Sequence, residues 1–386
     1  MIISILSLSF KSYGQVARIP FELYDNKFVL LTLCVNDNKD SLCFFFDTGA
    51  TSTLVDSAKA VRLGLKPNYE QNVSGAGGKK TYKVALNQTI LITNEIKVAN
   101  THIVLDDLSR LQNSLGKKFD GIIGNSILKE YKTRIDFDKK VIYLYPFTAN
   151  LDVTEYKEIS FDFLRGIQIP QFPVTMELKD GQKFTDTVFF DSGAGLYLFV
   201  NTPFKTKNKL LEIIGKTITS ESENLSSKSV QQEAIIKSLQ IHQFNFGEMP
   251  IQLSSDVQGV SSYEGYLGIL GADIIKRFNI VTDYNNKKLY LKPNLFFNSP
   301  IEFDLTGIGL KLENGVVKIS RIIKECEAYG KGLRENNTII SINDVSNATI
   351  DVFRQMLKKE QKKITIKYLS NSGERKEINI TLKRVI

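Results

Sequence analysis

Short apolar runs separated by polar turns dominate the first three-quarters of the chain. Phe28–Cys34 and Leu42–Phe46 are rich in β-branched and aromatic residues, and the turn-forming residues 36–40 separate them. The same arrangement returns at Val174–Leu178 and Thr187–Phe190, again around a polar turn. Stretches with helical spacing are few and brief. The pattern predicts hairpins of β-strands in both regions and a fold that is mainly β.

An internal repeat is the most specific feature of the sequence. Residues 124–131 align with residues 271–278 at an offset of 147, and the alignment continues without a gap to Pro146 and Pro293. Upstream, residues 45–50 match residues 189–194 at an offset of 144. One structural unit is therefore used twice. We expect one lobe over residues 19–150 and a second over residues 151–296.

The last segment, residues 301–386, has a different pattern and follows a predicted linker at 294–300. Thr349 is the expected N-cap of a helix from about Ile350 to Glu360, whose apolar residues form one stripe. The strands expected around this helix are Val316–Ile322, Thr338–Asn343, Ile364–Leu369 and Glu377–Lys383. We expect a small α/β domain here.

The formal net charge of +8 raises the question of a polyanion partner. The basic residues mostly do not cluster between aromatic residues, and the densest run, residues 358–363, is typical of a solvated helix end. A nucleic-acid partner is therefore not predicted. Weak attraction to an anionic membrane surface is an open alternative.

Residues 1–18 combine an apolar stretch with small polar residues, as in a secretory signal, but lack a basic start. An incomplete export signal and a buried first strand both fit this composition. We favour the export signal, which predicts a periplasmic or cell-envelope location.

Three cysteines are too few for a disulfide framework and lack metal-ligand spacing. Cys34 and Cys43 either face each other across a hairpin or are small buried apolar residues. No metal and no cofactor are predicted.

Asp47 and Asp191 are the strongest candidates for chemistry, because each ends an apolar run in the repeated unit. A single buried carboxylate is costly. If the two copies pack about a pseudo-twofold axis, the two carboxyl groups meet, and they cannot both ionise. They then share one proton, so the pair can accept a proton from water and donate one to a carbonyl oxygen.

The residues that follow each aspartate suit the same arrangement. Thr48 and Ser192 supply hydroxyls that can hydrogen-bond across the axis, and Gly49 and Gly193 let the two loops approach closely. These four residues are predicted to hold the catalytic loops.

At this point the chain resembles the pepsin and retropepsin superfamily of aspartic peptidases. The resemblance rests on two motifs that each occur twice. The first is Asp47-Thr48-Gly49-Ala50 and Asp191-Ser192-Gly193-Ala194. The second, further along each copy, is two apolar residues and a glycine, Ile122-Ile123-Gly124 and Ile269-Leu270-Gly271. It implies a bilobal, pepsin-like fold of two retropepsin-like β lobes. It also implies an endopeptidase in which Asp47 and Asp191 activate a water that attacks a polypeptide substrate.

The family closes a β-hairpin flap over its substrate. In this chain the glycine-rich segment with Gly75, Gly77 and Gly78 is the flap candidate in the first unit. Its counterpart in the second unit, residues 220–229, contains no glycine. The resemblance therefore implies one working flap, and either Tyr69 or Tyr82 could be its tyrosine.

Residues 301–386 resemble a PDZ domain of the bacterial type. Ile308, Gly309 and Leu310 match the carboxylate-binding loop, which implies binding of a peptide or protein C-terminus. The alternative is a small domain that only packs on the peptidase.

A second alternative concerns the whole chain, a catalytically inactive protein that binds or scaffolds peptides. Histidine-based catalysis is disfavoured, because neither His102 nor His242 accompanies a nucleophile motif. Both lie in expected strands, where histidines are usually hydrogen-bonded core residues.

Overall fold

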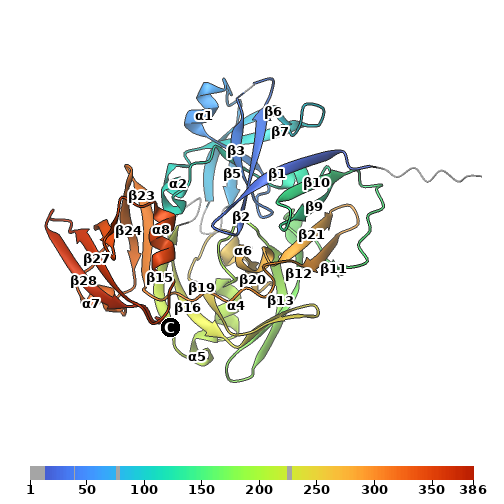
Figure 1. The fold of residues 1–386 in the computed structure, drawn as a ribbon. Helices are drawn as coiled ribbons and strands as arrows, with labels where there is room; N and C mark the ends of the chain where they lie inside the picture. The colour runs from blue at the N-terminus through green and yellow to red at the C-terminus, as the bar shows by residue number, and fades with distance from the viewer. Residues whose placement is uncertain (1–13, 39, 75–78, 224–227) are drawn as a thin grey trace, which may run out of the picture.

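The computed structural model describes residues 14–38, 40–74, 79–223 and 228–386. It is mainly β, with 45% strand and 13% helix, which confirms the expected predominance of β-strands (Figure 1). Three sheets organise the described residues. The predicted export segment lies largely outside them, and the first strand begins at Ala17.

The largest sheet has 13 strands. In spatial order they are β11 (Lys157–Ser160), β22 (Lys288–Pro293), β21 (Phe278–Asp283), β9 (Lys132–Asp136), β10 (Val141–Tyr145), β1 (Ala17–Tyr24), β2 (Phe28–Val35), β3 (Leu42–Phe46), β8 (Gly121–Ile123), β4 (Thr53–Asp56), β7 (Lys97–Asp106), β6 (Lys79–Leu91) and β5 (Tyr69–Ser74). The first half of β1 pairs with β10 and its second half with β2, so this strand joins two parts of the sheet.

The second sheet has nine strands. In spatial order they are β15 (Ile218–Glu223), β16 (Lys228–Ile236), β19 (Met249–Ser254), β14 (Leu198–Val200), β20 (Gly268–Leu270), β13 (Lys183–Phe190), β12 (Gln171–Glu177), β17 (Ser238–Ile241) and β18 (Phe244–Phe246). The repeated segments adopt the same pairing in both sheets. Phe46 lies opposite Ile123 in the parallel pair β3–β8, and Phe190 lies opposite Leu270 in the parallel pair β13–β20.

A pseudo-twofold axis runs between the two copies. Strand β9 pairs antiparallel with β21, and Arg134 lies opposite Val281. These two residues occupy equivalent positions of the repeat, at its offset of 147. Only a twofold relation places a residue opposite its own equivalent in an antiparallel pair. The two copies therefore meet in a shared part of the large sheet.

Residues 301–386, called the C-terminal unit below, form a six-stranded sheet. Its strands are β23 (Ile308–Glu313), β24 (Val316–Ile322), β25 (Thr338–Ile342), β26 (Val345–Ser346), β27 (Lys363–Leu369) and β28 (Arg375–Thr381). Its helices are α7 (Glu327–Gly330) and α8 (Ile350–Met356). The Thr349 hydroxyl caps α8 as expected, but the helix ends earlier than Glu360, because every residue from 358 to 363 is exposed and has no core to pack against.

The helices of the other two sheets are short. They are α1 (Ser57–Arg62), α2 (Ser109–Leu115), α3 (Asn125–Leu128), α4 (Thr202–Lys207), α5 (Leu210–Ile213) and α6 (Ala272–Ile275), with 3-10 turns at Leu164–Gly166 and Val260–Ser262. In the described part of the chain no helix has the length and apolar character needed to span a membrane.

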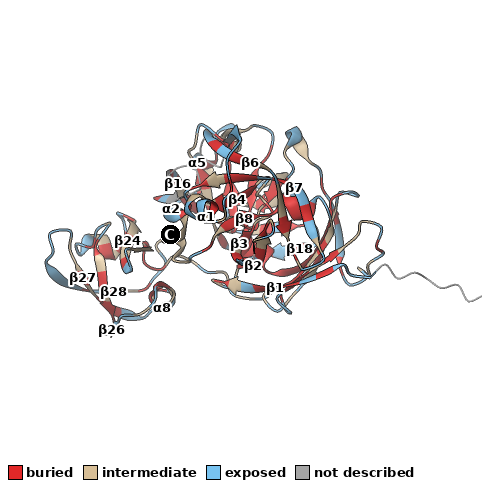
Figure 2. Ribbon diagram, turned by 90° about the horizontal axis from the view of Figure 1, so that it is seen from above, coloured by how far each residue is buried: buried red, intermediate tan, exposed pale blue. Residues whose placement is uncertain are grey.

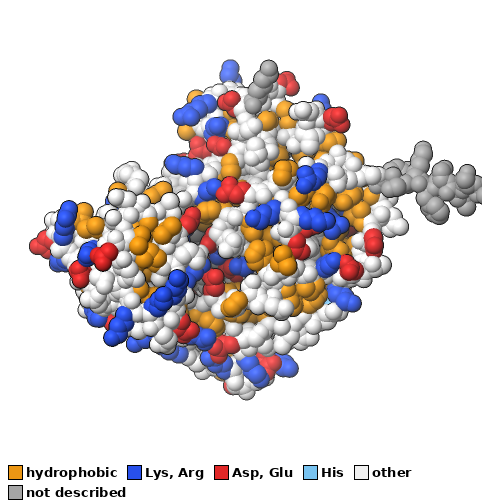
Figure 3. Space-filling model, in the orientation of Figure 1, with side chains coloured by type: hydrophobic (Ala, Val, Ile, Leu, Met, Phe, Trp, Pro, Cys, Tyr) orange, Lys and Arg blue, Asp and Glu red, His pale blue; other side chains and the backbone are white. Residues whose placement is uncertain are grey.

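Among the described residues, four clusters of buried hydrophobic residues support this arrangement, and two of them are large (Figure 2). One cluster draws buried residues from both large sheets, so the two copies of the repeat share a core. A second cluster fills the C-terminal unit and includes Ile218 of β15. On the face drawn in Figure 3, basic side chains are interspersed with acidic ones.

Candidate active site

Asp47 and Asp191 are placed by equivalent backbone contacts. Each follows the last residue of a strand, β3 or β13. The Asp47 N–H donates to the carbonyl of Ile123 at 2.8 Å, and the Asp191 N–H donates to the carbonyl of Leu270 at 3.0 Å. The neighbouring strands β8 and β20 thus fix where each carboxylate-bearing loop begins.

Reciprocal hydrogen bonds lock the two loops together across the axis. The Thr48 N–H donates to Ser192 Oγ at 3.0 Å, and the Ser192 N–H donates to Thr48 Oγ1 at 2.9 Å. Thr48 Oγ1 also donates to the Phe190 carbonyl at 2.7 Å. Both side chains are buried, so these bonds are shielded from competing water. The loops can hardly move apart without exposing unpaired polar groups.

Glycine is required where the loops meet. A Cβ added to Gly49 would lie 2.5 Å from Cγ of Asp191, and one added to Gly193 would collide with the Asp47 carboxylate. A Cβ on Gly124 would overlap the Asp47 carbonyl. The glycine of the companion motif therefore lets strand and loop approach closely.

The two carboxyl groups lie close enough to shift each other's pKa. Burial raises the pKa of Asp47 well above its ordinary value of 3.8, and the adjacent Asp191 raises it further. Burial also raises the pKa of Asp191, while hydrogen bonds from Asp47 and from the N–H groups of Gly193 and Ala194 oppose that rise. Both pKa values are thus raised, as expected for two adjacent buried carboxyl groups that cannot both be ionised.

Both carboxyl groups line one cavity of about 800 Å³. Its lining includes apolar residues from both copies of the repeat, Phe45 and Ile122 from the first and Phe199 and Ile269 from the second. Ile122 and Ile269 are equivalent positions of the repeat. The cavity is large enough for several residues of an extended peptide.

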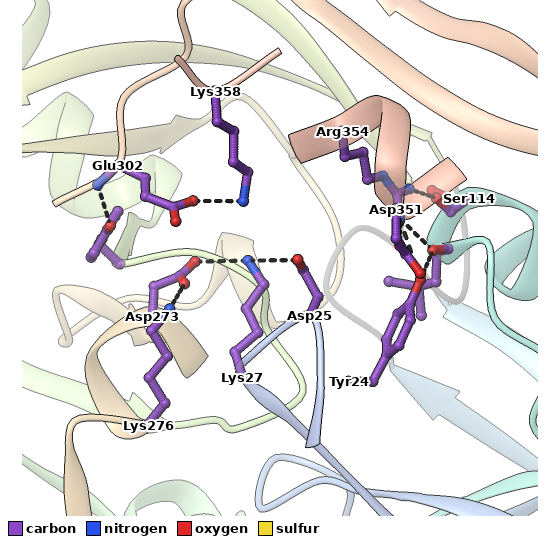
Figure 4. Close-up of polar contacts among 12 residues, drawn as sticks. Tyr24, Asp25, Lys27, Ser114, Asp273, Lys276, Glu302, Asp351, Arg354 and Lys358 are labelled. Carbon is purple, nitrogen blue, oxygen red and sulfur yellow. Dashed lines mark hydrogen bonds and ion pairs between the residues drawn. The ribbon is translucent and has the colours of Figure 1, made fainter. Parts of the chain in front are cut away.

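An ion-pair network beside the cavity joins the two copies (Figure 4). Lys27, in the turn between β1 and β2, lies 3.0 Å from Asp273 of α6 and 3.5 Å from Asp25. Asp273 also pairs with Lys276 at 3.0 Å. Burial alone would lower the pKa of Lys27, but the two carboxylates outweigh it and raise that pKa. The sequence pattern gave no sign of this network, because Lys27 and Asp273 are 246 residues apart.

The other predicted site residues fall in several places. Gly75, Gly77 and Gly78 lie outside the described residues. Of the two flap tyrosines considered, Tyr69 is exposed and Tyr82 is buried, and neither lines the cavity.

Ile308, Gly309 and Leu310 begin strand β23 and line the same cavity as the aspartates. That they bind a peptide carboxylate stays a prediction.

The histidine interpretation was wrong in detail. His102 lies in β7 but is exposed, and His242 lies in a left-handed turn between β17 and β18 rather than in a strand. Cys34, Cys43 and Cys326 are free thiols, and Cys43 lies opposite Thr32 rather than Cys34. Across the residues the structure describes, no group of three or more His, Cys, Asp or Glu side chains is arranged to hold a metal ion.

Residues 31–127 match the family model described as aspartyl protease. The match contains Asp47-Thr48-Gly49 and its companion Ile122-Ile123-Gly124. It covers a quarter of the chain and indicates protease activity in general, with polypeptide substrates. No curated protein matched the chain.

Proposed function

We propose that the protein is a bilobal, pepsin-like aspartic endopeptidase in which Asp47 and Asp191 form the catalytic pair. The observation that carries the proposal is the contact between these two carboxyl groups, on equivalent loops, in a cavity lined by residues from both copies of the repeat. The aspartyl protease match over the first copy of the repeat supports it.

In the proposed reaction the ionised Asp191 takes a proton from a water as that water attacks the peptide carbonyl carbon. The protonated Asp47 donates its proton to the carbonyl oxygen, so the new C–O bond forms without leaving a free oxyanion. Asp191, now protonated, then gives its proton to the amide nitrogen as the C–N bond breaks, and Asp47 takes a proton from a hydroxyl of the tetrahedral intermediate as the carboxylic acid forms. The pair returns to its starting protonation state, and no covalent intermediate is formed.

The locked loops account for the positioning that this reaction needs. The Thr48 and Ser192 bonds fix the separation of the carboxyl groups before substrate arrives. The N–H of Gly49 donates to Asp47 Oδ1 at 2.7 Å, and that of Gly193 donates to Asp191 Oδ1 at 2.9 Å. These bonds orient each carboxyl group.

The deciding experiment compares the wild type with Asp47→Asn and Asp191→Asn on a peptide library from acidic to neutral pH. We expect each variant to lose at least a thousandfold in kcat/KM, because neither can share a proton in the required way. A pepstatin-type inhibitor should block the wild type. Equal behaviour of all three proteins would instead favour the alternative, a protein that only binds peptides in this cavity.

Export is part of the proposal and rests on the apolar residues before Ala17. Sequencing the N-terminus of the protein isolated from its native cells tests it. Removal of an N-terminal segment is the expected result.

A further inference from the structure

The cavity that holds the aspartate pair is closed on one side by the C-terminal unit. Strand β23 contributes Leu310, β24 contributes Arg321, and the turn directly after α8 contributes Leu357 and Lys358. A freely tethered peptide-binding domain would not share a cavity with the catalytic pair. The C-terminal unit therefore lies where it can contact a substrate bound at the aspartate pair.

The edge of the C-terminal sheet is covered by the chain's own helix α2. Strand β23 ends the sheet, and α2 packs against it (Figure 1). The Arg354 guanidinium on α8 donates to the carbonyls of Ser114 at 2.8 Å, Leu115 at 2.6 Å and Leu310 at 3.1 Å. It thus spans the space between α8, β23 and α2 (Figure 4).

Close packing reinforces this contact. A Cβ on Gly116, directly after α2, would lie 2.5 Å from Cγ2 of Ile350. The Tyr24 hydroxyl lies 3.0 Å from Asp351 Oδ1 and donates to the Leu115 carbonyl at 2.7 Å. A peptide adding as a strand beside β23 would have to displace α2.

Backbone hydrogen-bond donors in the loop before β23 also have partners within the chain. Asp304 Oδ1 accepts hydrogen bonds from the N–H groups of Thr306 at 2.9 Å and Gly307 at 2.7 Å. Asp304 Oδ2 accepts from Arg321 at 3.3 Å. The Asp304 carboxylate therefore already accepts hydrogen bonds from the backbone N–H groups of Thr306 and Gly307, just before β23.

The unit is attached to the second large sheet as well. Arg321 donates to Glu233 of β16 at 2.8 Å, and Ile218 of β15 packs in the unit's own core. With α2 on one side and the β15–β16 hairpin on the other, the unit bridges both copies of the repeat beside the cavity.

An ion pair on this wall is accessible to a ligand. Lys358 Nζ lies 2.8 Å from Glu302 Oε2, and the two side chains are 36% and 57% exposed. Both line the cavity, and the Glu302 N–H donates to the Tyr197 hydroxyl, which lines it too. An exposed pair of this kind is weak, so a charged substrate side chain can take over either partner.

Building on the proposed peptidase function, we propose that the C-terminal unit is a wall of the substrate cavity, and that Lys358 and Glu302 determine its charge selectivity. Lys358 and Glu302 interact with the side chain that an extended peptide places against this wall, and they favour or disfavour it by its charge. The unit thereby selects what the aspartate pair cleaves.

The test uses the full chain and peptides in which each position around the scissile bond is Lys, Gln or Glu. Lys358→Glu puts two carboxylates on the wall. We expect kcat/KM for Lys relative to Glu to rise about fivefold or more at one position and to stay constant elsewhere. Lys376→Glu is the matched control, because Lys376 pairs with Glu374 at 3.1 Å, is 50% exposed and lies outside the cavity.

An unchanged ratio at every position, or the same shift in Lys376→Glu, would overturn the wall proposal while leaving the peptidase intact. If the wild type cleaves nothing, the proposed function fails separately. The wall proposal is then tested by binding. Fluorescence anisotropy measures the affinity of the same peptides for the Asp47→Asn variant and for the double variant Asp47→Asn, Lys358→Glu. Absence of any binding there would sink both proposals.

Discussion

Gly49 lies so close to Asp191 that a Cβ at this position would be 2.5 Å from the carboxyl carbon. The two residues belong to different copies of the repeat, yet their contact sets how near the carboxyl groups can come. The geometry of the proposed pair depends on the missing side chain.

Gly49→Ala should therefore lower the catalytic rate strongly, with a much smaller effect on the free energy of unfolding. The methyl group forces the Asp191 loop away, and displacements of this size cost on the order of a hundredfold in rate. Steady-state kinetics on a cleavable peptide measures the loss. Gly247→Ala is the control, because no atom lies within 4 Å of a Cβ there. Equal activities of the two variants would show that the close approach has no catalytic role.

Asp47→Asn should stabilise the protein at neutral pH while it abolishes cleavage. A raised pKa means that the folded state binds more protons than the unfolded state, so wild-type stability falls as pH rises above the ordinary value of 3.8. Asparagine removes that penalty. Denaturant unfolding at several pH values should show a gain at pH 7 that shrinks to nothing below about pH 4. A gain that grows toward acid would contradict the shared proton.

Thr48→Val should destabilise the fold by roughly 2 to 4 kcal/mol. The change removes the buried hydroxyl that accepts from Ser192 and donates to Phe190, and it leaves both partners unpaired. Thr48→Ser keeps the hydroxyl and loses only a methyl group, which costs about 1 kcal/mol. Urea midpoints distinguish the two. Equal losses would mean that packing, and not the reciprocal hydrogen bonds, holds the loops.

Lys27→Met should lower the free energy of unfolding by about 2 kcal/mol at pH 7, because buried Asp273 loses one of two cations. Burial would raise the pKa of Asp273, but Lys27 and Lys276 hold it below its ordinary value. That stabilisation exists above pH 3.8 and disappears as pH falls through the lowered pKa. The difference between variant and wild type should therefore vanish in acid.

Lys376→Met, which breaks an exposed pair with Glu374, serves as the control for Lys27→Met and should unfold like the wild type. A loss from Lys27→Met that persists unchanged below the lowered pKa of Asp273 would contradict an electrostatic role for the network.

The sequence determined the strands and the repeated loops. The strand Leu42–Phe46 was predicted with its observed bounds, because a continuous apolar run rich in aromatic residues carries a local signal. A duplicated motif made the pairing of Asp47 with Asp191 predictable despite their separation.

Tertiary structure decided the rest of the site. Arg354 reaches the carbonyls of α2 from about 240 residues away, and Lys358, just after α8, meets Glu302 near the start of the C-terminal unit. No local pattern marks a lysine or arginine for such a contact, since the partner is brought near only by the folded chain. A repeat can be detected in a single sequence because both copies carry the same pattern. A contact between two unrelated segments cannot be predicted in this way, because neither segment contains a pattern that points to the other.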